Sequence, residues 1–530
     1  MSVSDPLILN TEPGKVTSEP AAAGRGLDSR SFMPVFLGCL VVLVMSAIVF
    51  AITVKKLGHW YYPLDDTYIG MSLSKHLVQF GVWGTSTKFA SASSTPGFAV
   101  VLMVIYRLFG FSEYIPLIFG LVCAFCIVYV SDRFMRGSDI FLRSAVTVSV
   151  AVFVPLSTMV LIGMEHALQI LLCLIFLELV LPCIVEKTDL NWKVLTFAAL
   201  MVSVRYEDLF VAAGACLLLL IQRRWKSLVL LTGAAFFPVF AFGLFFRMHG
   251  GQWLPNSVLL KGGLSIYRLY SLLIYGPHMI LPIVVFTMLA WRYRNRFDTK
   301  AKAAAIITAT ALWLHFAMAG WGWVYRYEAY LIALAVITLG MEFVERRFSF
   351  GFGILIMFTA AIMCIHTIYA TFTIPGRSGV VFSQQYQMTK LILDMQVPTA
   401  VNDLGASTYF TDVPILDLVG LGSQDAFKDR YEKKYTTDNI RDLVSAHHVQ
   451  VICVYDKWFS TKYFVPWGGP PLPSEYILIA KLYSPDPYRF ASDDTVSYYA
   501  VPGVEQKLRT ALEKLQTTLP RWDSLTFTPR

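Results

Sequence analysis

Charged residues are scarce in this chain. Aspartate, glutamate, lysine and arginine make up 15% of its 530 residues, whereas hydrophobic residues make up 56%. A soluble domain carries about a quarter charged residues, so this composition excludes an ordinary soluble protein. Apolar runs of about 20 residues recur, which is the length that a helix needs to cross a bilayer core. We therefore expect a mainly α-helical, polytopic membrane protein.

Cysteine is also scarce, and its positions exclude two kinds of site. Seven of the eight cysteines lie within or at the ends of apolar runs, and Cys453 lies alone in the polar C-terminal tail. This spacing provides neither a disulfide framework nor a zinc site. The net charge of +8 is not gathered into a basic and aromatic patch, which excludes nucleic acid as a partner. The sequence predicts no organic cofactor.

The apolar segments predict about eleven spans between residues 32 and 372. They are expected at 32–54, 112–131, 144–162, 166–182, 193–204, 208–222, 227–246, 272–290, 303–319, 326–341 and 350–372. Residues 1–31, rich in proline, glycine, serine and alanine, are expected to form a flexible cytoplasmic leader. Residues 97–110 are apolar but short, so we expect them along the membrane surface or as a half-span.

The basic connections predict the orientation. Alternation from a cytoplasmic N-terminus places four basic clusters on the cytoplasmic side, at 133–143, 223–226, 292–302 and 346–347. A single helix at 193–222 would place the basic connection at 292–302 outside the cytoplasm, so the charge bias favours two short helices there that meet at a polar tip. An odd number of spans leaves 373–530 outside the cytoplasm as an α/β domain. Its expected strands are 449–455 and 476–482, and its expected helices are 383–395, 438–447 and 505–515.

The same alternation places several chemically capable side chains on the outer side. The first outer connection contains the adjacent acids Asp65 and Asp66, a pair suited to binding a cation or abstracting a proton. Ionisable residues at membrane depth are functional candidates. Four later outer connections supply Glu165 and His166, then Arg205 and Glu207, then Asn256 and Lys261, then Arg326 and Tyr327.

Each of these groups also has a structural interpretation. The acid pair could cap an interfacial helix, and Glu165 with His166 could form a snorkelling turn between two apolar spans. Arg205 with Glu207 could be an ion pair that seals a helix hairpin. Lys261 and Arg326 could be interfacial anchors beside aromatic residues. In the tail, Trp458, Phe459, Tyr463 and Trp467 could stack on sugar rings or pack in a core.

The order and sidedness of these groups resemble the GT-C membrane glycosyltransferases. The closest subgroup contains the mycobacterial terminal arabinofuranosyltransferase and its bacterial relatives. The chain departs from that subgroup at Tyr206, where proline is common, and at His166, where a small hydroxyl residue is common. The resemblance is carried by Asp65-Asp66-Thr67-Tyr68-Ile69, Gly81-Val82-Trp83-Gly84, Ser94-Thr95-Pro96, Gly163-Met164-Glu165, Arg205-Tyr206-Glu207, Leu254-Pro255-Asn256, Arg326-Tyr327 and the tail segments 402–406 and 415–421.

The resemblance implies a reaction and a location. A sugar, with arabinofuranose as one candidate, would pass from a polyprenyl-phosphate donor to a hydroxyl group of a glycan, lipid or protein acceptor, with inversion. The reaction would occur at the periplasmic face of a bacterial inner membrane. A transporter or flippase for polyprenyl-linked lipids or solutes is the alternative. Such proteins place their ionisable residues near the midplane, often in repeated halves, and we find no repeat in this sequence.

The resemblance and the residue chemistry together suggest roles for the candidates. Asp65 and Asp66 would be catalytic, with Asp65 as the base. A divalent cation such as Mg²⁺, Mn²⁺ or Ca²⁺ would be held by Asp66, Glu165 and His166. The cations Arg205, Lys261 and Arg326 would bind the donor phosphate. Further substrate contacts are expected from Tyr68, Glu207, Asn256 and Tyr327.

Overall fold

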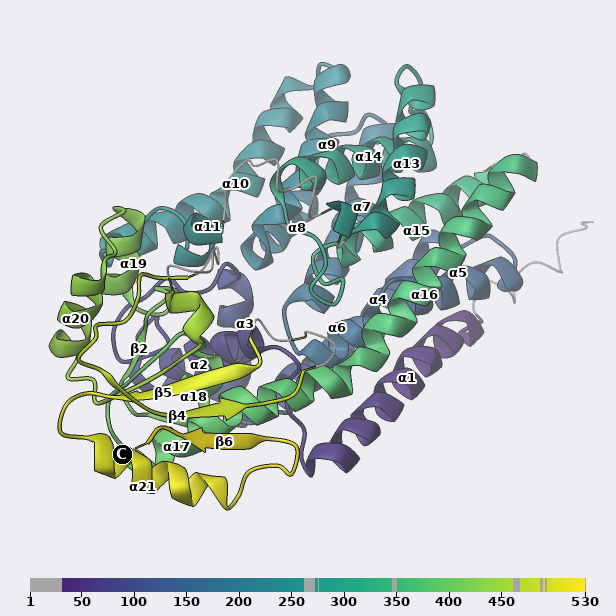
Figure 1. Ribbon diagram of the computed structural model, residues 1–530. Coiled ribbons are helices and arrows are strands. Elements are labelled where there is room, and N and C mark those ends of the chain that lie inside the picture. The colour runs from purple at the N-terminus through teal and green to yellow at the C-terminus, as the bar shows by residue number, and fades with distance from the viewer. Residues whose placement is uncertain are drawn as a thin grey trace, which may run out of the picture.

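The computed structural model describes residues 31–261, 272–274, 276–345, 350–460, 468–486, 490 and 493–529. The expected leader lies outside these residues, except for Ser31. Figure 1 shows a bundle of helices, with a domain that contains a β-sheet at one end of it. The bundle helices are α1 (Met33–Leu57), α4 (Ile115–Phe134), α5 (Ile140–Phe153), α6 (Leu156–Ile162), α7 (His166–Val185), α8 (Trp192–Val204), α9 (Leu209–Ile221), α10 (Trp225–Met248), α13 (Ile280–Tyr293), α14 (Lys300–Met318), α15 (Ala329–Glu345) and α16 (Phe350–Val381).

Each expected span overlaps at least one of these helices, but the count of eleven is not confirmed. In the described parts of the chain, six helices are long and apolar enough to cross a membrane, or seven if α5 and α6, bent by 43°, form one span. The helices α8 and α9 have only 13 residues each. At a rise of 1.5 Å per residue such a helix is about 20 Å long, shorter than a bilayer core of about 30 Å.

Small residues allow the bundle helices to pack closely. A Cβ added at Gly214 of α9 would lie 2.8 Å from the Cα of Ile307 in α14. On α14, Ala303, Ala304 and Ala305 are all buried. Helices in a membrane gain little from the hydrophobic effect, so close backbone approach through small residues is how they associate. This packing holds the ends of α7, α8 and α9 in fixed positions, which matters for the polar side chains between them.

The predicted break within 193–222 is confirmed. Helix α8 ends at Val204, Arg205 adopts an extended backbone, and a short 3₁₀ turn (η2, Tyr206–Asp208) leads into α9. Polar side chains are therefore concentrated at the turn, where the first N–H groups of α9 and the last C=O groups of α8 have no helical partners.

The C-terminal domain is built on a six-stranded mixed sheet with the order β2-β1-β3-β5-β4-β6. Strand β1 pairs in parallel with β2 and β3, and the other pairs are antiparallel. Its strands are β1 (Thr399–Val401), β2 (Ile415–Asp417), β3 (Val451–Val454), β4 (Ile477–Tyr483), β5 (Thr495–Ala500) and β6 (Ser524–Phe527). Its helices are α17 (Gln387–Met395), α18 (Gly405–Phe410), α19 (Gln424–Tyr431), α20 (Thr437–Ala446) and α21 (Glu505–Gln516). The two strands and three helices expected from the sequence are all present.

The C-terminal domain is joined to the bundle by one continuous helix and by helices that pack at the junction. Helix α16 runs through the expected boundary at residue 372 and continues by a π-helical turn (η4, Phe382–Tyr386) into α17. Helix α2 (Asp65–Phe80) packs against α18, and α3 (Pro96–Phe109) packs against α2. Figure 1 shows α2, α3 and α18 between the bundle and the sheet. The acid pair thus begins a helix at the junction of the two parts.

Candidate functional site

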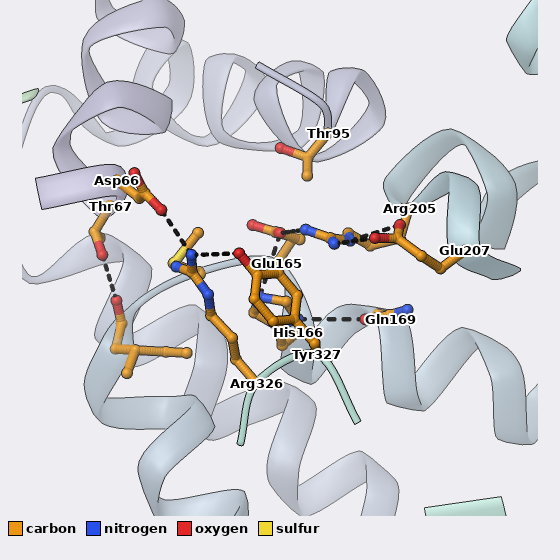
Figure 2. A network of polar contacts seen from close by, with 12 residues as sticks. Asp66, Thr67, Thr95, Glu165, His166, Gln169, Arg205, Glu207, Arg326 and Tyr327 are labelled. Carbon is orange, nitrogen blue, oxygen red and sulfur yellow. Dashed lines mark hydrogen bonds and ion pairs between the residues drawn. The ribbon is translucent and has the colours of Figure 1, made fainter. Parts of the chain in front are cut away.

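A buried polar network gathers side chains from four separate connections (Figure 2). Asp66 lies in the first turn of α2, Glu165 precedes α7, Arg205 follows α8, and Arg326 precedes α15. The sequence placed these residues on one side of the membrane by alternation. The structure brings them into contact across separations of up to 260 residues.

Arg326 lies at the centre of one half of the network. Its Nη2 donates to Asp66 Oδ2 at 2.7 Å and to the Tyr327 hydroxyl at 2.9 Å, and its Nη1 lies 2.9 Å from the sulfur of Met164. The guanidinium group also lies over the Tyr327 ring, 4.8 Å from its centroid. Its Nε is buried and has no hydrogen-bond partner among the described residues. The arginine is therefore only partly satisfied.

Arg205 occupies the other half and is more fully satisfied. Its Nη1 donates to Glu165 Oε1 at 2.8 Å, its Nε donates to Glu207 Oε2 at 3.1 Å, and its Nη2 donates to Glu207 Oε1. The guanidinium group lies 5.6 Å from the centroid of the Tyr327 ring, which is therefore close to both arginines. Two carboxylates neutralise this single cation, so little of its charge remains for a ligand.

The loop that carries Arg326 and Tyr327 has a strained backbone. Trp323, Val324 and Tyr325 have φ angles of +51°, +64° and +58°, which is the left-handed region. That region is costly for a residue with a side chain, and most costly for a β-branched one. Such strain persists only where the surroundings fix it, and it clusters at functional sites. Here Glu328 fixes the loop by accepting hydrogen bonds from the N–H of Gly322.

The residues expected to hold a divalent cation do not fit that role. Asp66 is paired with Arg326 and Glu165 with Arg205, while His166 Nδ1 lies 3.3 Å from Gln169 Oε1. Within the described ranges, no group of three or more histidine, cysteine, aspartate or glutamate side chains is placed to hold a metal ion. Arginine side chains pair with the carboxylates that the sequence suggested as metal ligands.

Asp65 holds the C-terminal domain against the bundle. Its Oδ2 accepts the N–H of Gly405 at 2.6 Å and its Oδ1 accepts the N–H of Ala406 at 2.8 Å, at the start of α18. Burial, together with the nearby charge of Asp403, raises the pKa of Asp65 well above its ordinary value, although the two backbone hydrogen bonds oppose this shift. A side chain at position 405 would collide with Asp65, because an added Cβ would lie 2.2 Å from its carbonyl oxygen.

A cavity of about 190 Å³ lies between the bundle and the C-terminal domain. The bundle side of its wall includes Asp66, Trp323, Arg326 and Arg377. The domain side includes the apolar residues Leu404, Val419 and Leu421. Its polar and aromatic residues, which we call the domain wall, are Gln385, Asn402, Asp403, Tyr455 and Trp458. Asp66 is the more accessible of the two adjacent acids, since its side chain is 36% exposed whereas Asp65 is 8% exposed.

Arg377 was not among the candidates from the sequence. It lies near the end of α16, where its Nε donates to Thr373 Oγ1 at 3.4 Å and its guanidinium lies 4.5 Å from the ring centroid of Phe490. It forms no ion pair with any acid that the structure describes. A sequence signal did exist, because Arg377 is the one charged residue in the segment 350–381.

Asp403 was also missed, and its environment is unusual. Gln385 Nε2 donates to its Oδ2 at 2.8 Å, and the Tyr455 hydroxyl lies 3.3 Å from the same oxygen. Burial, together with the charge of Asp66, raises the pKa of Asp403 to about 6, although the hydrogen bond from Gln385 opposes the shift. No side chain that the structure describes forms an ion pair with it. The carboxyl group therefore keeps its proton to a higher pH than an exposed aspartate does.

Two expected substrate contacts, Tyr68 and Asn256, do not line the cavity, and one expected phosphate ligand, Lys261, has a side chain outside the described residues. Tyr68 is buried among aromatic rings, and its hydroxyl accepts the N–H of Tyr62 at 3.1 Å. Asn256 is buried and accepts from Ser91 at 2.9 Å, while its Nδ2 faces the carbonyl of Gly420 at 3.3 Å. Both side chains stabilise the junction. The side chain of Lys261 lies outside the described residues, as do Tyr463 and Trp467.

Comparisons with known proteins identify the fold. A family model described as a domain of unknown function, DUF8728, matches residues 378–499. No curated protein matches the chain. The crystal structure of ArnT from Cupriavidus metallidurans bound to undecaprenyl phosphate is similar over 89% of this chain and 99% of that chain, with a TM-score of 0.54 and 11% identity. Archaeal oligosaccharyltransferase AglB from Archaeoglobus fulgidus, in complex with an inhibitory peptide and a dolichol-phosphate, is similar over 92% of this chain and 76% of that chain, with a TM-score of 0.42 and 13% identity.

The likeness to ArnT confirms the expected fold class. The chain is a multi-pass membrane protein that shares the fold of the ArnT structure, a helical bundle followed by a C-terminal domain that contains a sheet. The identity is too low for the likeness to carry an activity with it.

Proposed function

We propose that the protein is a glycosyltransferase that moves a sugar from a polyprenyl-phosphate donor to a hydroxyl acceptor. The observation that carries the proposal is the cavity at the junction, where an accessible carboxylate and two arginines share one space. Transfer of a glycosyl group from a phosphate needs cations for the leaving group and a base for the acceptor hydroxyl. The shared fold with an ArnT structure that holds undecaprenyl phosphate supports a polyprenyl-phosphate donor.

Arg377 and Arg326 are the proposed ligands of the donor phosphate. When the bond between the anomeric carbon and the phosphate oxygen breaks, its electron pair moves to the phosphate, so negative charge grows there. Arginine matches phosphate because its planar fork can donate two parallel hydrogen bonds. Arg377 forms no ion pair with a described acid, so none has to be broken before phosphate binds. Arg326 has a buried Nε that lacks a hydrogen-bond partner among the described residues. Arg205 has two carboxylate partners, and we assign it to the scaffold.

Asp66 is the proposed base. Both oxygens of Asp65 already accept backbone hydrogen bonds from α18, which makes Asp65 a positioning residue. Asp66 lines the cavity and is paired with Arg326 at 2.7 Å. A donor phosphate would compete with Asp66 for this arginine. Loss of its cationic partner would raise the affinity of Asp66 for a proton, so donor binding would prepare the base to take the proton of the acceptor hydroxyl as that oxygen attacks the anomeric carbon.

A single displacement of this kind inverts the anomeric carbon. Arabinofuranose is the candidate sugar from the sequence resemblance. The positive charge of the four basic connections favours a cytoplasmic location for them. The junction would then lie at the periplasmic face of a bacterial inner membrane. The acceptor hydroxyl would then belong to a component of the cell envelope.

The test is donor consumption by the purified protein. Vesicles containing the protein are supplied with a panel of polyprenyl-phosphate sugars, and the release of polyprenyl phosphate is measured. Asp66→Asn should lower transfer about 10²- to 10⁴-fold, the range of general-base catalysis. Asp298→Asn is the matched control, since Asp298 is exposed and paired with Lys302 in a distant connection. Movement of intact donor across the bilayer without cleavage would instead support the flippase.

A further inference from the structure

The domain wall of the cavity has a hydrogen-bonding pattern of its own. Gln385 lies in the π-helical turn after α16, Asn402 and Asp403 follow β1, and Tyr455 and Trp458 follow β3. Since β1 and β3 are parallel neighbours, the residues after them reach the same edge of the sheet. The sheet thus presents a fixed group of polar and aromatic side chains to the bundle.

The hydrogen bonds within this wall converge on one oxygen atom of Asp403. Gln385 Nε2 donates to Asp403 Oδ2 at 2.8 Å and to the Tyr455 hydroxyl at 3.0 Å. The Tyr455 hydroxyl in turn donates to Gln384 Oε1 at 2.9 Å, which leaves its contact with Asp403 Oδ2 at 3.3 Å as the weaker one. The other oxygen, Asp403 Oδ1, forms no hydrogen bond with the described residues. One carboxylate oxygen is therefore fixed and the other has its full accepting capacity.

Two more polar atoms of the wall lack partners. Asn402 Oδ1 accepts the N–H of Tyr455 at 3.0 Å, but Asn402 Nδ2 is buried with no hydrogen-bond partner among the described residues. The same holds for Gln385 Oε1. Buried polar groups in folded proteins are nearly always paired, so each exception needs an explanation. A donor and two acceptors, contributed by three neighbouring residues, are left without partners beside one cavity.

We propose that the domain wall is the acceptor subsite and that the acceptor is a carbohydrate. A sugar hydroxyl both donates and accepts, so adjacent hydroxyls of one sugar ring can pair with Asn402 Nδ2, Gln385 Oε1 and Asp403 Oδ1 together. A lipid alcohol or a serine side chain offers one hydroxyl and would leave the other atoms without partners. This inference rests on the proposed function and names the acceptor class for the same cavity.

The aromatic residues of the cavity agree with a sugar ring. Trp458 and Tyr455 lie edge to face with their ring centroids 5.6 Å apart, and Trp323 approaches from the bundle side. The face of a sugar ring carries C–H groups that pack on aromatic rings, while its hydroxyls project from the edge. Aromatic rings and unpaired polar atoms that line one cavity match that distribution.

Asn402→Asp and Asp403→Asn test the subsite with little change of shape. Asn402→Asp keeps the oxygen that accepts from Tyr455 and replaces the unpaired donor with an acceptor. Asp403→Asn replaces the carboxylate with an amide of the same size. The purified variants are compared with the wild type for binding of neutral methyl glycosides and disaccharides by saturation-transfer NMR. A long-chain alcohol and a serine-containing peptide serve as the other hydroxyl probes.

We expect glycosides, and neither of the other probes, to bind the wild type, and each variant to weaken binding at least tenfold. Asp456→Asn is the control, since Asp456 lies in the same domain but pairs with Lys481 and Tyr499. Unchanged glycoside binding in both variants, or preferred binding of the alcohol or the peptide, would overturn the proposal. A donor-cleavage assay separates the acceptor proposal from the proposed function. If only the acceptor proposal is wrong, the wild type still cleaves the donor. If the wild type cleaves no donor, the proposed function is rejected.

Discussion

At the scale of the residue, the arginines near the cavity differ in what neutralises them. Arg205 has two carboxylates within hydrogen-bond distance, Arg326 has one, and Arg377 has none among the described residues. Their order in the sequence gives no hint of this difference. An arginine that already has its carboxylates serves the fold, and one without a carboxylate is available to an anionic ligand.

Arg205→Ala should therefore act on stability. The substitution leaves Glu165 buried with no cation against it, which costs about 3–5 kcal/mol in comparable buried pairs. The melting temperature in detergent is expected to fall sharply, while Arg294→Ala, at an exposed position beside Trp291, should leave it nearly unchanged. If Arg205→Ala melts like the wild type but no longer binds donor, the phosphate role suggested by the sequence would be restored to Arg205.

Arg377→Ala should act on donor binding instead. A hydrogen bond to a charged group contributes about 1.5–3 kcal/mol, so the KM for the donor is expected to rise about 10- to 100-fold. Arg377→Lys should recover part of the loss, because it keeps the charge and loses the fork. The KM for the acceptor should not change. An equal rise in both constants would show that Arg377 merely supports the shape of the cavity.

Asp403 predicts a pH dependence of stability. Its pKa is raised from 3.8 to about 6 in the folded protein, so the folded state holds a proton that the unfolded state has released between those values. Its contribution to the free energy of unfolding is fully present below about pH 4 and is lost as the pH rises through about 6, a decline of about 3 kcal/mol. Asp403→Asn should flatten this decline in thermal unfolding. Asp65 shifts in the same direction, so part of the slope should remain.

At the scale of the element, α18 is fixed to α2 by a close contact at Gly405, where a larger residue would not fit. The N–H groups of Gly405 and Ala406 both reach Asp65, and an added Cβ at position 405 would lie 2.2 Å from the Asp65 carbonyl oxygen. This close approach sets how the C-terminal domain sits on the bundle, and it therefore sets the width of the cavity.

Gly405→Ala should separate the two parts. Because the added methyl group meets backbone, α18 must move, and amide exchange of residues 399–410 is expected to become faster. Gly70→Ala is the matched control: Gly70 lies within α2, its added Cβ would meet nothing within 4 Å, and alanine favours a helix by about 1 kcal/mol. Unaltered exchange in Gly405→Ala would mean that the contact does not hold the domain in place.

The helices were more predictable than the strands. The spans and the break at Arg205 follow from hydrophobic runs and from the balance of basic connections, which are local or additive properties. Strands β1 and β2 have three residues each, too few for an alternating pattern to be recognised. Helices α8 and α9 were expected as spans, but their lengths are set by the turn at Arg205 and by packing against α10 and α14.

At the scale of the whole molecule, the gathering of the site residues at one place was the part of the site that the sequence could predict. Alternation placed Asp66, Glu165, Arg205 and Arg326 together, and the structure joins them in one network. It could not predict which acid pairs with which arginine, because pairing depends on distances of a few ångströms. Nor could it show that residues 340 positions apart, such as Asp65 and Gly405, would meet and enclose a cavity with Arg377 and Asp403 in its wall.

The most direct measurement locates the donor phosphate on the whole protein. A polyprenyl phosphate with a photoreactive group beside its phosphate is bound to the purified protein in vesicles, irradiated, and its attachment sites are mapped by mass spectrometry. We expect labels at the start of α2, in 321–328 and near Arg377, and we expect excess undecaprenyl phosphate to remove all of them. Competed labels confined to the basic connections at 133–143, 223–226 and 292–302 would contradict this expectation.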